Sequence, residues 1–318
     1  MARTSDVATL VAQARDGQPR AVARLISLVE DASPQLREVM AALAEHAGHA
    51  HVVGITGAPG VGKSTSTSAI VAALRAQGKR VGVLAIDPSS PFSGGALLGD
   101  RIRMQEHATD PGVYIRSMAS RGHLGGLSWS TPQALRVLDA AGCDVILLET
   151  VGVGQSEIEV VGIADTVLVL LAPGMGDGIQ AAKAGILEIG DIFVVNKADR
   201  DGASTTSREL RHMISLAERP EGAWRPPVLK TVASQGEGID KVVDEIDKHY
   251  AWAQESGELT RRRERRAADE IEAIAVASIR ARMADLGSDV RLLDLAKSVA
   301  AGQTDPYAAA DQLIAALD

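Results

Sequence analysis

Cysteine and aromatic residues are scarce in this sequence. Its 318 residues include one cysteine, Cys143, so a disulfide within the chain is excluded and a reducing compartment is favoured. Aromatic residues make up 3% of the chain, whereas hydrophobic residues as a whole make up 46%. The core must therefore be built from aliphatic side chains, which suits parallel strands buried between helices.

Long apolar runs and an excess of positive charge are also lacking. No apolar run approaches the roughly 18 residues that a membrane-spanning helix needs, and residues 1–18 lack the apolar centre of a secretory signal. The formal net charge is −8, which argues against general binding to nucleic acid. We therefore expect a cytoplasmic protein with neither a membrane nor a nucleic-acid partner.

A glycine-rich segment follows the apolar run 51–56 and precedes residues 66–75, whose apolar side chains have helical spacing. Its residues are Gly57, Ala58, Pro59, Gly60, Val61, Gly62, Lys63, Ser64 and Thr65. This is the Gly-x-x-x-x-Gly-Lys-Ser pattern of a phosphate-binding loop, in which backbone amides and a helix N-terminus face the phosphates. We expect Lys63 to reach the β- and γ-phosphates and Ser64 to ligate Mg²⁺. An ordinary Gly/Pro turn would require neither side chain.

Two further apolar runs end in an acid. Residues 81–86 lead to Asp87, and residues 144–148 lead to Glu149. Ligands of open α/β sheets bind at the carboxyl ends of the strands, so both acids are candidates for the Mg²⁺ sphere. For Asp87 the alternative is a cap of the turn before Pro88. Gly152, shortly after Glu149, is expected to offer its N–H to the γ-phosphate.

The chain also has a candidate guanine-recognition motif. The apolar run 191–195 leads into Asn196, Lys197, Ala198 and Asp199. A carboxylate placed here accepts from both N1–H and the N2 amino group of guanine, and adenine lacks this donor pair. The motif is short, but its place at a strand end far downstream of a phosphate loop makes it specific. We therefore expect GTP and GDP as ligands, with backbone groups of Val232 and Ala233 closing over the base.

The order of these elements predicts an α/β fold: a P-loop NTPase with a mostly parallel central sheet flanked by helices. We expect an N-terminal helical segment (1–50), a P-loop GTPase domain (51–254) and a C-terminal helical dimerisation region (255–318). The last region carries an apolar stripe that includes Ile271, Ile274 and Ile279 and needs a partner surface. The charge run 258–266 indicates a solvated helix face, and a basic stripe for a partner is the alternative.

Three histidines, His46, His49 and His51, are close in the sequence. Imidazole is a common metal ligand. A helix end followed by a strand start is expected to point them in different directions, and no Cys or carboxylate with ligand spacing is nearby. We therefore favour a structural role.

Taken together, the motifs resemble the MeaB/ArgK group of P-loop GTPases, to which the human methylmalonic aciduria type A protein belongs. The resemblance covers nearly the whole chain, and its most specific block is 149–157. It implies a G-protein chaperone for an adenosylcobalamin-dependent acyl-CoA mutase, usually methylmalonyl-CoA mutase. It also implies a homodimer formed through the C-terminal helices.

The resemblance further implies roles for single residues. Asn196, Lys197 and Asp199 would read guanine. The candidates for catalysis and the Mg²⁺-linked switches are Lys63, Ser64, Asp87, Asp100, Glu149 and Gln155. A loop carrying Gln180 and Lys183 would sense the partner. Many GTPases have a water-orienting glutamine directly after the glycine that corresponds to Gly152, but this chain has Val153, which predicts slow intrinsic hydrolysis.

Two other functions fit parts of the pattern. A nickel-delivery GTPase would need Cys/His clusters, which one cysteine and a loose histidine trio do not supply. Older names of similar chains suggest a transport-system kinase of the LAO/AO type, but the sequence shows no separate protein-kinase acceptor site.

Overall fold

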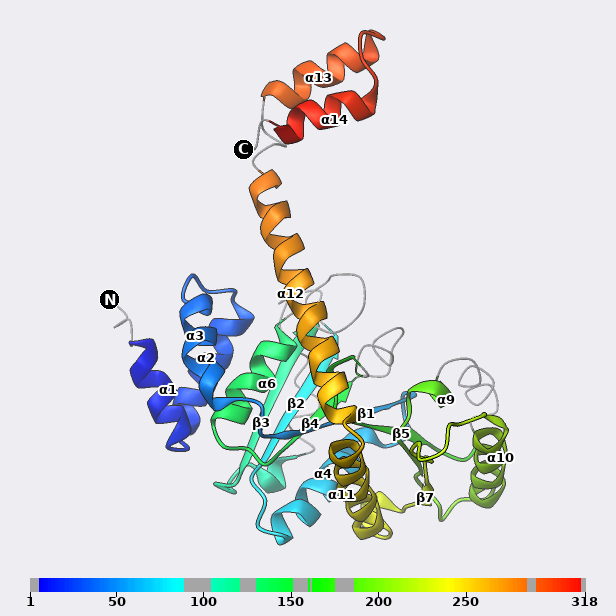
Figure 1. The fold of residues 1–318 in the computed structure, drawn as a ribbon. Coiled ribbons are helices and arrows are strands. Elements are labelled where there is room, and N and C mark those ends of the chain that lie inside the picture. Colours follow the sequence, from blue (N-terminus) through cyan, green and yellow to red (C-terminus); the bar gives the residue numbers. More distant parts are fainter. Residues whose placement is uncertain are drawn as a thin grey trace. The chain divides into compact units, whose positions relative to one another are not determined.

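A parallel sheet of seven strands forms the centre of the fold (Figure 1). The computed structural model describes residues 6–88, 104–120, 130–150, 160, 162–174, 186–284 and 290–315. The strands are β1 (His51–Gly57), β2 (Val81–Pro88), β3 (Val113–Ser120), β4 (Val145–Thr150), β5 (Thr166–Leu171), β6 (Ile192–Val195) and β7 (Val228–Lys230). Their order is β3-β2-β4-β1-β5-β6-β7, and every pairing is parallel. The predicted α/β P-loop fold is confirmed.

Helices cover both faces of the sheet, and its strands, which are aliphatic on both sides, are therefore buried. One face packs against α1 (Val7–Arg15), α2 (Pro19–Glu30), α3 (Leu36–Leu43), α6 (Thr131–Ala140) and α10 (Ala203–Leu216). The other packs against α4 (Lys63–Ala76) and α11 (Ile239–Glu255). The short helices are α9 (Ile186–Ile189), η1 (Ala44–His46), η2 (Gln105–His107) and η3 (Ala233–Gln235). The N-terminal helices thus share one core with the sheet.

A buried polar network ties together the N-terminal ends of three adjacent strands. The Thr166 hydroxyl at the start of β5 lies 2.7 Å from His51 Nε2 and 2.8 Å from His249 Nδ1. On its other side His249 Nε2 lies 3.2 Å from Asp191 Oδ1, just before β6. Because buried polar groups are costly unless paired, this network fixes β1, β5 and α11 relative to one another. The carboxyl ends of the same strands lead into the candidate site.

By their contacts, residues 1–259 and 260–318 form two compact units. The second unit contains α12 (Glu258–Ala284) from Thr260 onward, together with α13 (Val290–Ala300) and α14 (Pro306–Ala315). Large apolar side chains are exposed on α12, with Ile271 68% and Ile279 56% accessible. No helix in the described part of the chain is long and apolar enough to span a bilayer. The predicted three-part division, with boundaries at 50 and 254, stays a prediction.

Candidate nucleotide-binding site

The predicted phosphate loop joins β1 to α4. Gly57, Gly60 and Gly62 have φ of +142°, +81° and +97°, a region that favours glycine. At Gly62 space is also short, because a Cβ built there would lie 2.5 Å from Asn196 Nδ2. The buried Lys63 ammonium points back into the loop and donates to the carbonyls of Gly57 (2.6 Å) and Ala58 (3.2 Å). The loop therefore has the tight backbone path and the internal cation that phosphate binding requires.

Hard oxygen donors meet beside the loop. The Ser64 hydroxyl, in the first turn of α4, donates to Glu149 Oε1 at 2.7 Å. Glu149 sits on β4 and is buried, with 4% of its surface accessible. Its other oxygen, Oε2, lies 2.9 Å from the hydroxyl of Thr67. A hydroxyl and a carboxylate are ligands that Mg²⁺ accepts, so Ser64 and Glu149 fit the predicted metal position.

The predicted guanine motif is fastened to the phosphate loop by two side chains. Asn196 Nδ2 donates to the Val61 carbonyl at 2.9 Å, and Lys197 Nζ donates to the Gly60 carbonyl at 2.6 Å. Lys197 has φ +56°, which is unusual for a residue other than glycine. These contacts bring two motifs that are far apart in the sequence to one end of the sheet.

On the base side, the loop after β7 packs against the same asparagine. Asn196 Oδ1 accepts from Thr231 Oγ1 and from the Ala233 N–H, both at 3.1 Å. The Val232 N–H donates to the Glu237 carbonyl at 3.0 Å. Val232 and Ala233 therefore lie beside the motif, with their N–H groups engaged within the protein. No hydrogen bond to another described residue engages the exposed carboxylate of Asp199.

Several predicted site residues lie outside the described residues: Asp100, Gly152, Gln155, Gln180 and Lys183. Asp87 is the penultimate residue of β2, opposite Ala119, and its side chain is outside the described atoms. Our sequence reasoning missed Thr67. The available signal was its position three residues after Ser64, which places both hydroxyls on one side of a helix.

Away from the loop, an ion pair anchors the far end of α4. Arg75 Nε and Nη2 donate to the two carboxylate oxygens of Asp110 at 2.9 and 3.0 Å. This pairing, with the N–H of Gly112 as a second donor, lowers the pKa of Asp110. The pair is peripheral to the candidate site and has a structural role.

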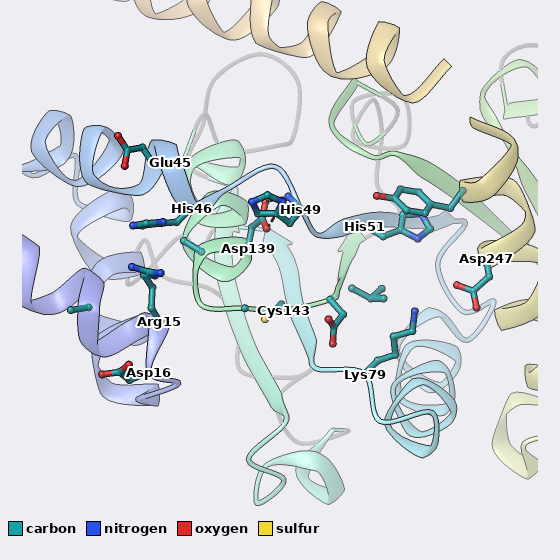
Figure 2. A pocket seen from close by; sticks show the side chains of 16 residues that line it. Arg15, Asp16, Glu45, His46, His49, His51, Lys79, Asp139, Cys143 and Asp247 are labelled. Atoms are coloured by element: carbon teal, nitrogen blue, oxygen red, sulfur yellow. Dashed lines mark hydrogen bonds between the residues drawn. The ribbon is translucent and has the colours of Figure 1, made fainter. Parts of the chain in front are cut away.

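His46, His49 and His51 all line one pocket of about 760 Å³, and their side chains lie at separate places along it (Figure 2). His51 is buried there, bonded to Thr166 and stacked on Tyr250 with ring centroids 4.0 Å apart. Asp139 accepts from the backbone N–H groups of Gly48, His49 and Ala50 and so shapes the turn that carries His49. Within the described ranges no group of three or more His, Cys, Asp or Glu side chains is arranged to hold a metal ion.

Cys143 also lines this pocket, and burial raises the pKa of its thiol to about 12. We expect it to react with a disulfide reagent at pH 8 at least about 100-fold more slowly in the folded protein than in guanidinium, where its pKa returns to about 8.5. Because the folded pKa is raised, the protonated thiol's stabilising contribution is present below the unfolded pKa and is lost as pH rises toward 12. The rate of reaction is measured from the absorbance of the thiolate that the reagent releases. Equal rates in the folded and the unfolded protein would contradict the prediction.

Comparison with known proteins decides the family. The model of the family described as Methylmalonyl Co-A mutase-associated GTPase MeaB matches residues 22–287. The chain belongs to the MeaB family. The predicted resemblance is therefore confirmed, and membership in a family of GTPases implies guanine-nucleotide binding.

Other members and one solved structure extend the match. A GTPase-family protein of Pyrococcus abyssi is 47% identical over 307 residues, which cover 96% of this chain and 95% of that protein. The mouse Methylmalonic aciduria type A homolog, mitochondrial, is 41% identical over 215 residues, 67% of this chain and 52% of that protein. A crystal structure of a LAO/AO transport system kinase is 25% identical, with a TM-score of 0.72 and 98% of both chains covered.

Proposed function

We propose that this MeaB-family protein binds GTP, hydrolyses it slowly to GDP and phosphate, and acts as a chaperone for an adenosylcobalamin-dependent acyl-CoA mutase, with methylmalonyl-CoA mutase the first candidate. The observation that carries the nucleotide part is the pair of bonds from Asn196 and Lys197 to the Val61 and Gly60 carbonyls. They support the proposal because they join the Asn-Lys-x-Asp segment to the phosphate loop. The family's description and the mouse relative's name support the mutase part.

In this proposal the residues divide the work by their chemistry. Backbone N–H groups of the loop and the Lys63 ammonium neutralise the phosphates, and Asp199 selects guanine. Ser64 and Glu149 would hold Mg²⁺, with Asp87 and Asp100 as further candidates; when bound, the ion would supply charge neutralisation at the β- and γ-phosphates. A water attacks the γ-phosphorus while the bond to the β-phosphate oxygen breaks, which releases GDP and phosphate.

We propose that the segments carrying Gln155, Gln180 and Lys183 respond to the mutase. Val153 can neither donate to nor accept from a water, so the protein alone lacks a water-orienting group at that position. We expect single-turnover GTP hydrolysis to be far slower than the ~10 s⁻¹ of an ordinary enzyme, and to rise at least about tenfold with cognate methylmalonyl-CoA mutase.

The measurement uses γ-labelled GTP with active mutase, heat-inactivated mutase or none. Label released as free phosphate supports the GTPase, whereas label transferred to a protein would favour the kinase activity named for the LAO/AO relative. A fast basal rate that the mutase leaves unchanged would contradict the chaperone role. The expected compartment in this proposal is the cytoplasm.

We also propose a homodimer formed through the second unit. Exposed Ile271 and Ile279 on α12 would be covered by the partner's copy, since exposed large apolar side chains on one helix mark an interface. Sedimentation of the double variant Ile271→Asp/Ile279→Asp should give half the mass of the unmodified protein. Ala273→Asp adds one such charge at a position about 200° around the helix from Ile271, and this variant should remain dimeric. An unmodified protein that sediments as a monomer would contradict the proposed homodimer.

A further inference from the structure

The first two turns of α4 hold a buried carboxylate with two hydroxyls. Ser64 and Thr67 are three residues apart and so face the same side of the helix. Ser64 Oγ lies 2.7 Å from Glu149 Oε1, and Thr67 Oγ1 lies 2.9 Å from Glu149 Oε2. Thr67 is fully buried, and Glu149 is nearly so. Each oxygen of the carboxylate therefore faces a different hydroxyl.

A second acceptor competes for the Thr67 proton. Thr67 Oγ1 lies 3.0 Å from the Lys63 carbonyl, the usual bond of a threonine to the preceding turn of its own helix. A hydroxyl has one proton, so it cannot donate fully to both acceptors. The bond to the carboxylate is shorter and charge-assisted, and such bonds are roughly twice as strong as neutral ones. The Thr67 hydroxyl therefore donates to the Glu149 carboxylate rather than to the Lys63 carbonyl.

We infer that Thr67 is a positioning residue that locks the Glu149 carboxylate in the plane where Oε1 faces Ser64. The terminal torsion of glutamate is broad and two-fold, so hydrogen bonds at both oxygens restrict its rotation more than a bond at Oε1 does without one at Oε2. If the Ser64 oxygen ligated Mg²⁺ through a lone pair, its proton would remain available for the bond to Oε1. A carboxylate fixed at its other oxygen by Thr67 keeps that proton, and hence the lone pair, in place. The inference rests on the proposed nucleotide function.

The test measures Mg²⁺ affinity rather than turnover. Release of a fluorescent GDP analogue is followed across a range of Mg²⁺ concentrations and, separately, in EDTA. Thr67→Val keeps the shape and removes the hydroxyl, and we expect it to raise the half-saturating Mg²⁺ concentration about tenfold. GDP affinity in EDTA should stay within twofold of the unmodified protein, since the Thr67 hydroxyl bonds to the Glu149 carboxylate and the Lys63 carbonyl, and neither group is a donor to phosphate. Thr67→Ser, which keeps the hydroxyl, should restore Mg²⁺ affinity to within about threefold.

A neighbouring residue on the same helix gives a matched control. Ser66 is buried, and its hydroxyl has no hydrogen-bond partner among the described residues. Ser66→Ala should therefore leave Mg²⁺ dependence unchanged. Thr67→Ala removes the hydroxyl without the bulk of valine and should match Thr67→Val, so the test still decides if valine prevents folding.

The possible outcomes distinguish a failure of the Thr67 inference from a failure of the proposed function. Unchanged Mg²⁺ dependence in both hydroxyl-free variants would overturn the inference. An equal loss of GDP affinity with Mg²⁺ and in EDTA would also overturn it, because a threonine with a purely structural role predicts that result. In either case Mg²⁺-dependent GDP retention by the unmodified protein would leave the proposed function intact. An unmodified protein that binds no GDP would overturn both.

Discussion

Asp199→Asn is expected to lower the affinity for GTP and GDP by about two orders of magnitude. In the proposed site the carboxylate would accept two hydrogen bonds from guanine, and an amide would present a donor where an acceptor is needed. Losing a charged pair of hydrogen bonds in a specificity pocket costs about 2–4 kcal/mol. Asp199 is exposed and makes no hydrogen bond to another described residue, so the substitution should leave the fold intact. No gain for ATP is expected, because adenine's amino group does not reproduce the lost pattern.

Equilibrium titration with fluorescent GDP, followed by competition with unlabelled GTP and ATP, measures this change. Asp201→Asn is the matched control, since it removes the same charge from another exposed position two residues away. It should bind GDP as the unmodified protein does. Equal affinity of the unmodified protein for GTP and ATP would rule out the guanine assignment.

Much of the fold could be predicted because its signals are local. Each predicted strand is an aliphatic run, and glycine with Lys63 and Ser64 marks one strand-to-helix turn in a way that few other structures require. The family could be predicted because its motifs, such as the block 149–157, are continuous segments of the sequence. The order of the strands could not be deduced this way, because β4 lies between β1 and β2 although it follows both in the chain.

The contacts that assemble the site escaped prediction for the same reason. Asn196 and Val61 are 135 positions apart, and Thr67 and Glu149 are 82 apart. A threonine inside a helix is ordinarily explained by a bond to the preceding turn, and its spacing from Ser64 does not by itself identify Glu149 as the common acceptor. The pocket was also beyond the reach of sequence spacing, because it brings together His51, at the start of a strand, and His49, in the turn held by Asp139.

Gly62→Ala should nearly abolish nucleotide binding, with a loss of about 100-fold or more in GDP affinity. Two effects combine. Alanine at φ +97° is strained by about 1–2 kcal/mol. The added Cβ would also lie 2.5 Å from Asn196 Nδ2, closer than real Cβ atoms approach a neighbour, so the asparagine must move. Its three bonds to Val61, Thr231 and Ala233 then weaken, at about 1 kcal/mol for each bond lost.

Gly60→Ala separates the two effects. Gly60 has φ +81°, so alanine there is strained to a similar degree, but apart from its chain neighbours its Cβ would meet no atom of the described residues within 4 Å. We expect a loss of about tenfold or less in GDP affinity. Both variants are titrated with fluorescent GDP after thermal melting confirms that they fold. If the two lose affinity equally, backbone strain alone explains the effect and Asn196 does not couple the guanine motif to the phosphate loop. If Gly62→Ala loses at least ten times more, the difference measures that coupling.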